Sequence, residues 1–425
     1  MKTFARESFA ALAFILAAAN GSAVMAADQP SELFRGLFGP DPSIALTSHP
    51  VLELRVSTFE ARGRTPSDTL EQTVLQAEGF YTGVSSGLTF RQKTRNALFT
   101  VGTGNTLRMY PSSDVTTTEH SGFASMDLQA SRYTTVRASG GVFYTPFHQV
   151  LGVPAYIDPG TAVGSDASLG SDTSLTYSAA TAITRQLGRR GLLIADYDGH
   201  VTQFTSGSGD TTSHRASVAY AHEFAKGIAF RFGDGVRVLQ AAATDRIVTQ
   251  DIILGIDVNR TLESSRQTSF SFNTGATIMD TGTGNRFVPS GSATLTHRLS
   301  RAWQTSIRFD RGLQVAELVS EAFIANNSSV VLNGFIGRRL SVGVRGGYSF
   351  GNFDLDGSSM PYNSYVAEGR AAVALGRHFQ LYMQHMYYRY RFPDAITLPS
   401  DVPFRREQYS IRFGLDIWAP LVGRL

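Results

Sequence analysis

Strict alternation of apolar and polar residues most constrains the fold of this chain. Between residues 340 and 350 every second residue is apolar or small, in the order Leu340, Val342, Val344, Gly346, Tyr348 and Phe350. The same period of two recurs over 251–259, 303–310 and 409–417. This period places successive side chains on opposite faces of a β-strand, and no comparable helical period appears after residue 48. The sequence therefore predicts an all-β fold whose strands each have one apolar and one polar face.

The predicted connections between strands have two alternating lengths. Short basic or polar turns are expected at about 92–95, 131–132, 187–190, 225–227, 262–266, 299–301, 337–339 and 376–378. Longer segments rich in Gly, Ser, Asp and Pro separate them. Short turns at one end and long loops at the other are typical of up-and-down barrels. Eight short turns separate nine hairpins, which predicts about eighteen strands. Sixteen is the alternative, because 61–80 and 111–121 are hard to divide into strands and turns.

The N-terminus has the pattern of a secretory signal peptide. Lys2 and Arg6 precede an apolar run over 9–19, and small residues follow as far as Ala26 and Ala27. The run is about half the length of ~20 residues that a transmembrane helix needs. We expect residues 1–26 to be a cleaved signal peptide and 27–48 to be an N-terminal segment outside the strands. An uncleaved membrane anchor is the alternative.

Composition excludes several classes of protein. The chain has no cysteine, which rules out disulfides, thiolate catalysis and zinc-cysteine sites. Its mean hydropathy is -0.08, and after the signal peptide no apolar run approaches the length of a transmembrane helix. The net charge of +3 is small and the arginines are evenly spread, so no nucleic-acid partner is expected.

The last predicted strand carries a resemblance to a known class. The run Phe413 to Trp418 alternates apolar and polar residues and ends on an aromatic, although Ala419 to Leu425 follow it. With the alternating turns, this resembles the broad class of Gram-negative outer-membrane β-barrels, the porin-like proteins, over residues 49–418. The resemblance implies a transmembrane antiparallel up-and-down β-barrel over 49–425, in the bacterial cell outer membrane. Segment 27–48 would then lie in the periplasm, and outer-membrane lipid and lipopolysaccharide would surround the barrel.

A soluble β-sandwich or propeller is the alternative fold. The chain shows no fixed repeat of the kind that propeller blades produce. Aromatic residues also gather near predicted strand ends, which favours girdles at two membrane interfaces. These residues are Phe379, Tyr382, Tyr387, Tyr388, Tyr390 and Phe392.

The alternation predicts which charged residues face the barrel interior. Arginine facing lipid at mid-depth costs about 2–4 kcal/mol, so the polar face must meet water or paired charge. The expected channel-lining residues are Arg137, Asp196, Asp198, Arg231, Arg237, Asp251, Asp257, Arg308, Asp310, Arg345, Glu368, Arg370, Arg412 and Asp416. The alternative is that these charges pair across neighbouring strands and fill the lumen.

Two segments of the sequence, 146–171 and 352–357, have features that suggest a special role. By resemblance to general porins, the long connection 146–171 could fold into the lumen, and a surface loop is the alternative. Segment 352–357 matches the opening of a calcium loop, but Asn363 replaces the bidentate Glu, so a turn is favoured. No hydrolase, metalloprotease or phosphate-binding motif is present. We expect no enzymatic activity, no metal and no cofactor.

The sequence thus favours a passive path for small polar solutes or saccharides across the outer membrane. One alternative is an exit port for exopolysaccharide that works with a periplasmic export partner. The other is a surface scaffold whose lumen is plugged and which transports nothing.

Overall fold

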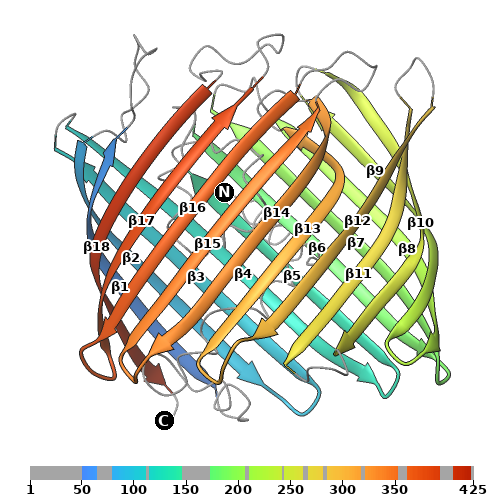
Figure 1. Ribbon diagram of the computed structural model, residues 1–425, viewed down its shortest axis with the longest axis horizontal. Helices are drawn as coiled ribbons and strands as arrows, with labels where there is room; N and C mark the ends of the chain where they lie inside the picture. The colour runs from blue at the N-terminus through green and yellow to red at the C-terminus, as the bar shows by residue number, and fades with distance from the viewer. Residues whose placement is uncertain are drawn as a thin grey trace, which may run out of the picture.

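The computed structural model describes residues 50–64, 79–111, 114–145, 173–205, 210–241, 244–261, 267–280, 285–316, 321–352, 361–392 and 405–422. These form one antiparallel sheet of eighteen strands, in which each strand pairs with the next in sequence and β1 pairs with β18 (Figure 1). The strands are β1 (Val51–Arg64), β2 (Gly79–Lys93), β3 (Ala97–Tyr110), β4 (Val115–Ser131), β5 (Thr134–Thr145), β6 (Ser174–Leu187), β7 (Gly191–Phe204), β8 (Thr211–Ala225), β9 (Ile228–Ala241), β10 (Thr244–Thr261), β11 (Thr268–Asp280), β12 (Asn285–Arg298), β13 (Trp303–Ala316), β14 (Glu321–Ile336), β15 (Leu340–Asn352), β16 (Pro361–Ala374), β17 (Phe379–Arg391) and β18 (Arg405–Val422). Among the described residues, no helix is long and apolar enough to cross a membrane.

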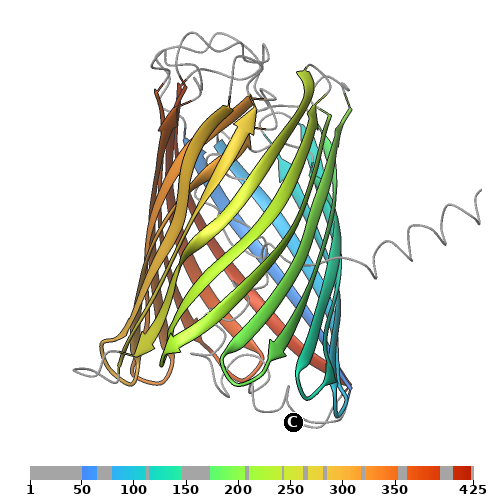
Figure 2. The same ribbon diagram turned by 90° about the vertical axis from the view of Figure 1, so that its right-hand side faces the viewer.

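The closed barrel confirms the predicted fold class and the larger strand number. Segment 61–80 contains the end of β1 and the start of β2, and 111–121 contains the start of β4. The eight predicted short turns fall between successive strands, and 262–266 itself lies outside the described residues. Figure 2 shows the short turns at the same end as the C-terminal end of β18. The architecture is a closed antiparallel up-and-down β-barrel, the fold that the resemblance implied.

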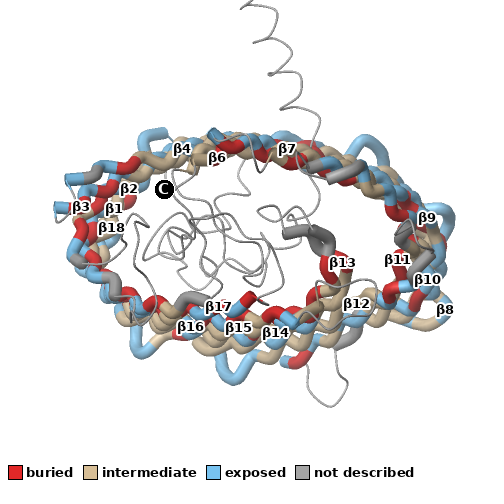
Figure 3. The backbone as a smooth tube through the Cα atoms, turned by 90° about the horizontal axis from the view of Figure 1, so that it is seen from above, coloured by how far each residue is buried: buried red, intermediate tan, exposed pale blue. Residues whose placement is uncertain are grey.

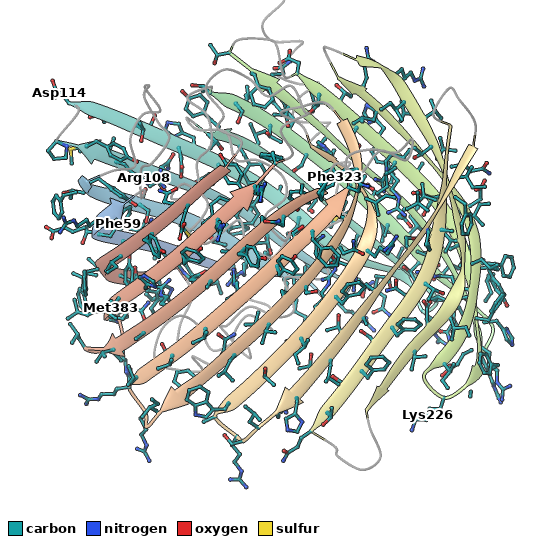
Figure 4. The ribbon with its side chains drawn as sticks, turned by 45° about the horizontal axis from the view of Figure 1, so that its top comes forward. Phe59, Arg108, Asp114, Lys226, Phe323 and Met383 are labelled. Atoms are coloured by element: carbon teal, nitrogen blue, oxygen red, sulfur yellow. The ribbon has the colours of Figure 1, made fainter. Side chains whose placement is uncertain are left out.

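Alternation along the strands separates an apolar outer face from a polar inner face. Val344, Met383 and Phe413 are examples of the outer set, with exposed fractions of 50%, 46% and 55%. Figure 4 places Met383 at the outer edge of the wall. On the inner set, side chains of non-neighbouring strands meet, as Ser57 Oγ of β1 and Tyr382 OH of β17 do at 3.2 Å. Such meetings require the concave side of a curved sheet, which identifies the inner face.

The expected aromatic girdle is wrong for four of its six residues. Tyr382, Tyr388, Tyr390 and Phe392 are buried and belong to the inner set of β17 and the residue after it. Only Phe379 and Tyr387 share the outer set of Met383. Because β17 carries aromatic residues on both faces, closeness to the strand end did not reveal the face.

The predicted terminal aromatic is also placed differently. Strand β18 continues past Trp418 to Val422, so this residue does not end the strand. Its side chain is buried, and its indole Nε1 donates to Glu53 Oε2 of β1 at 3.4 Å. Trp418 therefore helps to join the first and last strands on the inner face.

One hairpin end departs from the barrel wall. Strands β12 and β13 pair from Gly291 with Arg311 down to Arg298 with Gln304, whereas β13 pairs with β14 as far as Ala316 with Glu321. Figure 3 shows this end of β13 inside the ring of the wall. We call residues 312–316 with 321–323 the inner hairpin. It makes the barrel interior asymmetric.

A glycine under an aromatic ring tests the packing of the inner face. A Cβ at Gly83 of β2 would overlap the Phe59 ring, which is itself buried against Tyr81. We predict that Gly83→Val lowers the free energy of unfolding by about 1–3 kcal/mol, because the ring has little room to move.

The matched control for this change is Gly346→Val on β15, where a Cβ would meet nothing within 4 Å. The measurement is the thermal unfolding midpoint of the barrel in detergent. Equal midpoints for the two variants would contradict the packing described here.

Candidate functional site: the interior wall of the barrel

A carboxylate network lies on the inner face of β8 to β11. Asp251 Oδ2 lies 2.9 Å from Arg215 Nε and 3.8 Å from Arg237 Nη2. Its other oxygen accepts a hydrogen bond of 2.7 Å from Thr277 Oγ1. Asp251 is only 4% exposed, so both arginines are held by a carboxylate that is itself fixed on three sides.

Two further ion pairs lie on the inner face of β15 to β18. Arg370 Nη2 of β16 lies 2.7 Å from Asp416 Oδ2 of β18, across the intervening strand, and Gln380 Nε2 donates to the same oxygen at 2.6 Å. Arg345 Nη1 lies 3.9 Å from Glu368 Oε2, which is directly opposite in register. The amides and guanidinium groups thus bind carboxylates along one continuous stretch of wall.

Aromatic rings pack beside these ion pairs. Phe59, Tyr81, Tyr110 and Tyr382 form a buried cluster with two alanines, and the Tyr81 and Tyr110 rings stack at 5.0 Å. The guanidinium of Arg412 lies over the Phe59 ring at 4.4 Å and donates to Tyr81 OH at 3.4 Å. Figure 4 labels Phe59 on this part of the wall. The rings are buried, so they support the arginine and do not form an exposed track for sugars.

The structure pairs ten of the fourteen predicted interior residues with one another. These pairs are Arg231 with Asp257, Arg237 with Asp251, Arg308 with Asp310, Arg345 with Glu368, and Arg370 with Asp416. Of the others, Arg412 contacts the aromatic cluster and Asp196 Oδ1 accepts from Ser217 Oγ at 2.8 Å. Asp198 lies opposite Arg215 in register. Arg137 Nε lies 3.0 Å from Asp127 Oδ1, and both side chains are more than half exposed.

Sequence reasoning missed several charged residues of the inner face. Arg108 makes a bidentate pair with Glu119, at 2.7 and 3.1 Å, and is completely buried. Glu53 accepts from Arg91 at 3.4 Å. Alternation also points to these positions, because Arg108 stands between Leu107 and an exposed methionine of the outer set. Arg215 and Asp127 were missed as well.

The inner hairpin contacts a strand of the wall that is not its neighbour in the sheet. Arg237 Nη1 of β9 donates to the Leu313 carbonyl at 3.1 Å, although β10, β11 and β12 lie between their strands in the sheet. Where β13 leaves β12, Arg311 donates to the Pro289 carbonyl at 3.2 Å and to Asn326 Oδ1 at 3.0 Å. Arg237 therefore joins the Asp251 network to an element that narrows the interior.

Two predicted segments lie outside the described residues, namely 146–171 and most of 352–357. Within the described ranges, no group of three or more His, Asp or Glu side chains could hold a metal ion. The arrangement is a wall of paired charges beside an inward hairpin. Charges of both signs thus face the interior of the closed barrel.

Comparison with known proteins gives structural similarity at low sequence identity. No known protein family and no curated protein sequence matches the chain. Similar solved structures include Acinetobacter baumannii OccAB4, with a TM-score of 0.45 and 9% identity over 89% of this chain and 100% of that one. Pseudomonas aeruginosa OpdL gives 0.44 and 11% identity over 88% and 99%, and OpdQ from the same organism gives 0.43 and 12% over 88% and 98%.

The contact between Arg237 and the inner hairpin can be tested by thiol labelling, because the chain has no native cysteine. Leu313 is 7% exposed, and its carbonyl, not its side chain, accepts the hydrogen bond. We predict that Leu313→Cys reacts slowly with a maleimide and that adding Arg237→Ala raises the rate by about tenfold, as expected for losing one charged hydrogen bond.

The matched control is Arg231→Ala in the Leu313→Cys background. Arg231 is on the same strand and face as Arg237 but pairs with Asp257 at 3.2 Å. Equal rates in the two double variants would show that Arg237 does not hold the hairpin.

Proposed function

We propose that this protein is an outer-membrane channel that gives small polar solutes a passive path across the membrane. The observation that carries the proposal is a closed barrel with an apolar exposed outer face and an ion-paired inner face. At about eighteen strands, wall side chains alone do not fill a barrel. The fourteen predicted charged residues would line the passage, and the inner hairpin would narrow it.

The outer face supports insertion in a bilayer. Val344, Leu254 and Phe232 are 50%, 58% and 50% exposed, and residues of this kind recur around the barrel. Such a surface is unfavourable in water and suits lipid. The short turns would face the periplasm, together with segment 27–48, after removal of the signal peptide 1–26. No step in this role needs catalysis or a cofactor.

Saccharides are a more specific candidate for the solute. The aromatic rings of the inner face bear on this candidate, because sugars are commonly recognised by stacking on exposed rings. Tyr362, Tyr388 and Phe323 of the inner face are 0–2% exposed, so they offer no free ring for stacking on a sugar. Recognition would then depend on the charged groups, on the width beside the inner hairpin and on the ring of Phe123, which is 40% exposed on the inner face. An export port with a periplasmic partner and a plugged surface scaffold are the outcomes that the next experiment separates.

Single-channel recording tests the proposal directly. We expect the purified protein to produce steady conductance steps in a planar bilayer, because the polar wall is continuous. Added oligosaccharide should reduce the current if sugars enter the passage.

If the protein shows a thermal unfolding transition, and is therefore folded, but produces no conductance steps, an open channel is contradicted. It would favour the plugged scaffold or an exporter that opens only with its partner.

Charge reversal tests whether the predicted residues line the passage. Arg345→Glu with Arg370→Glu changes the wall charge by two units at each position, so we expect ion selectivity to shift toward cations. The measurement is the reversal potential in a salt gradient.

Arg246→Glu provides the control, since Arg246 alternates with the outer residues Val248 and Leu254 of β10. This variant should leave the reversal potential unchanged. Unaltered selectivity in the double variant would show that Arg345 and Arg370 do not face the ion path.

A further inference from the structure

Arginines concentrate on the outer face of three adjacent strands, at the end of the barrel opposite the short turns. Arg389 and Arg391 continue the alternating series of outer residues of β17, and both side chains are exposed. Arg62 of β1 is also exposed and lies opposite Ile411, an outer residue of β18. Strand β18 pairs with both β17 and β1, and Figure 1 shows β17 beside β18. Arg62, Arg389 and Arg391 are called the rim arginines below.

The backbone register adds two more arginine positions to the same area. Position 405 of β18 lies directly opposite Arg391, and position 64 of β1 lies opposite Tyr409. Two acids, Glu60 and Glu407, also occur on these strand ends, and Glu407 lies opposite Arg389. Among the described side chains, the three rim arginines outnumber these two acids, which leaves the area positively charged.

Tyrosines form the boundary between the rim arginines and the apolar part of the outer face. The Tyr387 and Tyr409 rings are 4.9 Å apart, and Tyr409 OH donates to Glu407 at 2.7 Å. On the neighbouring strands, the Tyr348 and Tyr365 rings stack at 4.6 Å. Tyrosines with apolar rings and polar hydroxyls gather at the headgroup level of a membrane. The rim arginines therefore lie at or just beyond this level.

The rest of the same rim lacks a comparable group. Among the described strand residues, the other outer-face arginines at this end are Arg246 of β10 and Arg311 of β13. Arg311 is bonded to the Pro289 carbonyl and to Asn326. Arg246 is therefore the single comparable arginine away from β17, β18 and β1.

We propose that the outer face of β17, β18 and β1 binds the phosphate groups of one lipopolysaccharide molecule in the outer leaflet. This rests on the orientation in the proposed function, which places this end outside the cell. Guanidinium groups bind phosphate oxygens in a bidentate manner, and several of them within two strand spacings can hold more than one phosphate. The tyrosines would contact the sugar and acyl boundary of the same lipid.

The test compares lipid binding by native mass spectrometry of the full barrel extracted from bacterial membranes and delipidated in detergent. The probe is lipid A that carries both phosphates, and the comparison probe is lipid A with its phosphates removed. We expect the native protein to bind the phosphorylated probe and to bind the dephosphorylated probe at least about tenfold more weakly. Excess inorganic phosphate should compete only weakly if the lipid as a whole is recognised.

The decisive variant is Arg62→Gln with Arg389→Gln and Arg391→Gln, and its control is Arg246→Gln. We expect the triple variant to lose binding by about tenfold or more and the control to keep it. Equal binding by the two variants, or equal binding of both lipid probes, would overturn the proposal. An unchanged thermal unfolding transition in lipid-free detergent verifies that the triple variant is folded.

Failure here can be distinguished from failure of the proposed function. None of the substituted arginines is on the inner face, so single-channel conductance should be the same in the triple variant as in the native protein. Conductance without phosphate-dependent binding would reject the lipid site alone. Phosphate-dependent binding without conductance would reject the channel and keep the lipid site.

Discussion

The pairing of β1 with β18 is the constraint on which the rest of this structure depends. An open sheet leaves two rows of unpaired backbone N–H and C=O groups, and in hydrocarbon each unpaired group costs several kcal/mol. Pairing from Leu52 with Val422 to Arg64 with Tyr409 removes both edges at once. The contact between Trp418 and Glu53 strengthens the same junction from inside. Closure also gives the sheet a concave face, which is why contacts such as Arg370 with Asp416 can cross an intervening strand.

The inner face satisfies its charges locally. Asp251 holds two arginines and a threonine, and Glu368 accepts from Gln384 at 2.9 Å besides its contact with Arg345. A charge paired in this way costs less to keep out of bulk water, and removing one partner exposes the cost for the other. The wall can therefore be highly polar and still well packed. Its charges form a fixed pattern through which a solute would pass.

Period-two alternation was sufficient to predict the strands and most of the turns. It worked because most strands have one apolar and one polar face, and because short turns such as 337–339 separate the strands. It failed for Tyr388 and Tyr390, since β17 is aromatic on both faces, and for Trp418, since the strand continues beyond it. The inner hairpin was not predictable either. It depends on a tertiary hydrogen bond between Arg237 and a backbone carbonyl, which leaves no local pattern in the sequence.

Where β13 leaves β12, the width of the barrel interior becomes linked to the continuity of the wall. In a regular barrel these two properties are independent. Residues 285–290 of β12 pair with β11, but their other edge lies along the part of the wall that β13 has left. If the inner hairpin returned to the wall, that edge would regain a partner and the interior would become wider in the same movement. In the structure, Arg237 binds the Leu313 carbonyl of the inner hairpin, and Arg311 donates to the Pro289 carbonyl at the edge that β13 has left. The width of the interior and the continuity of the wall therefore depend on the same strand end.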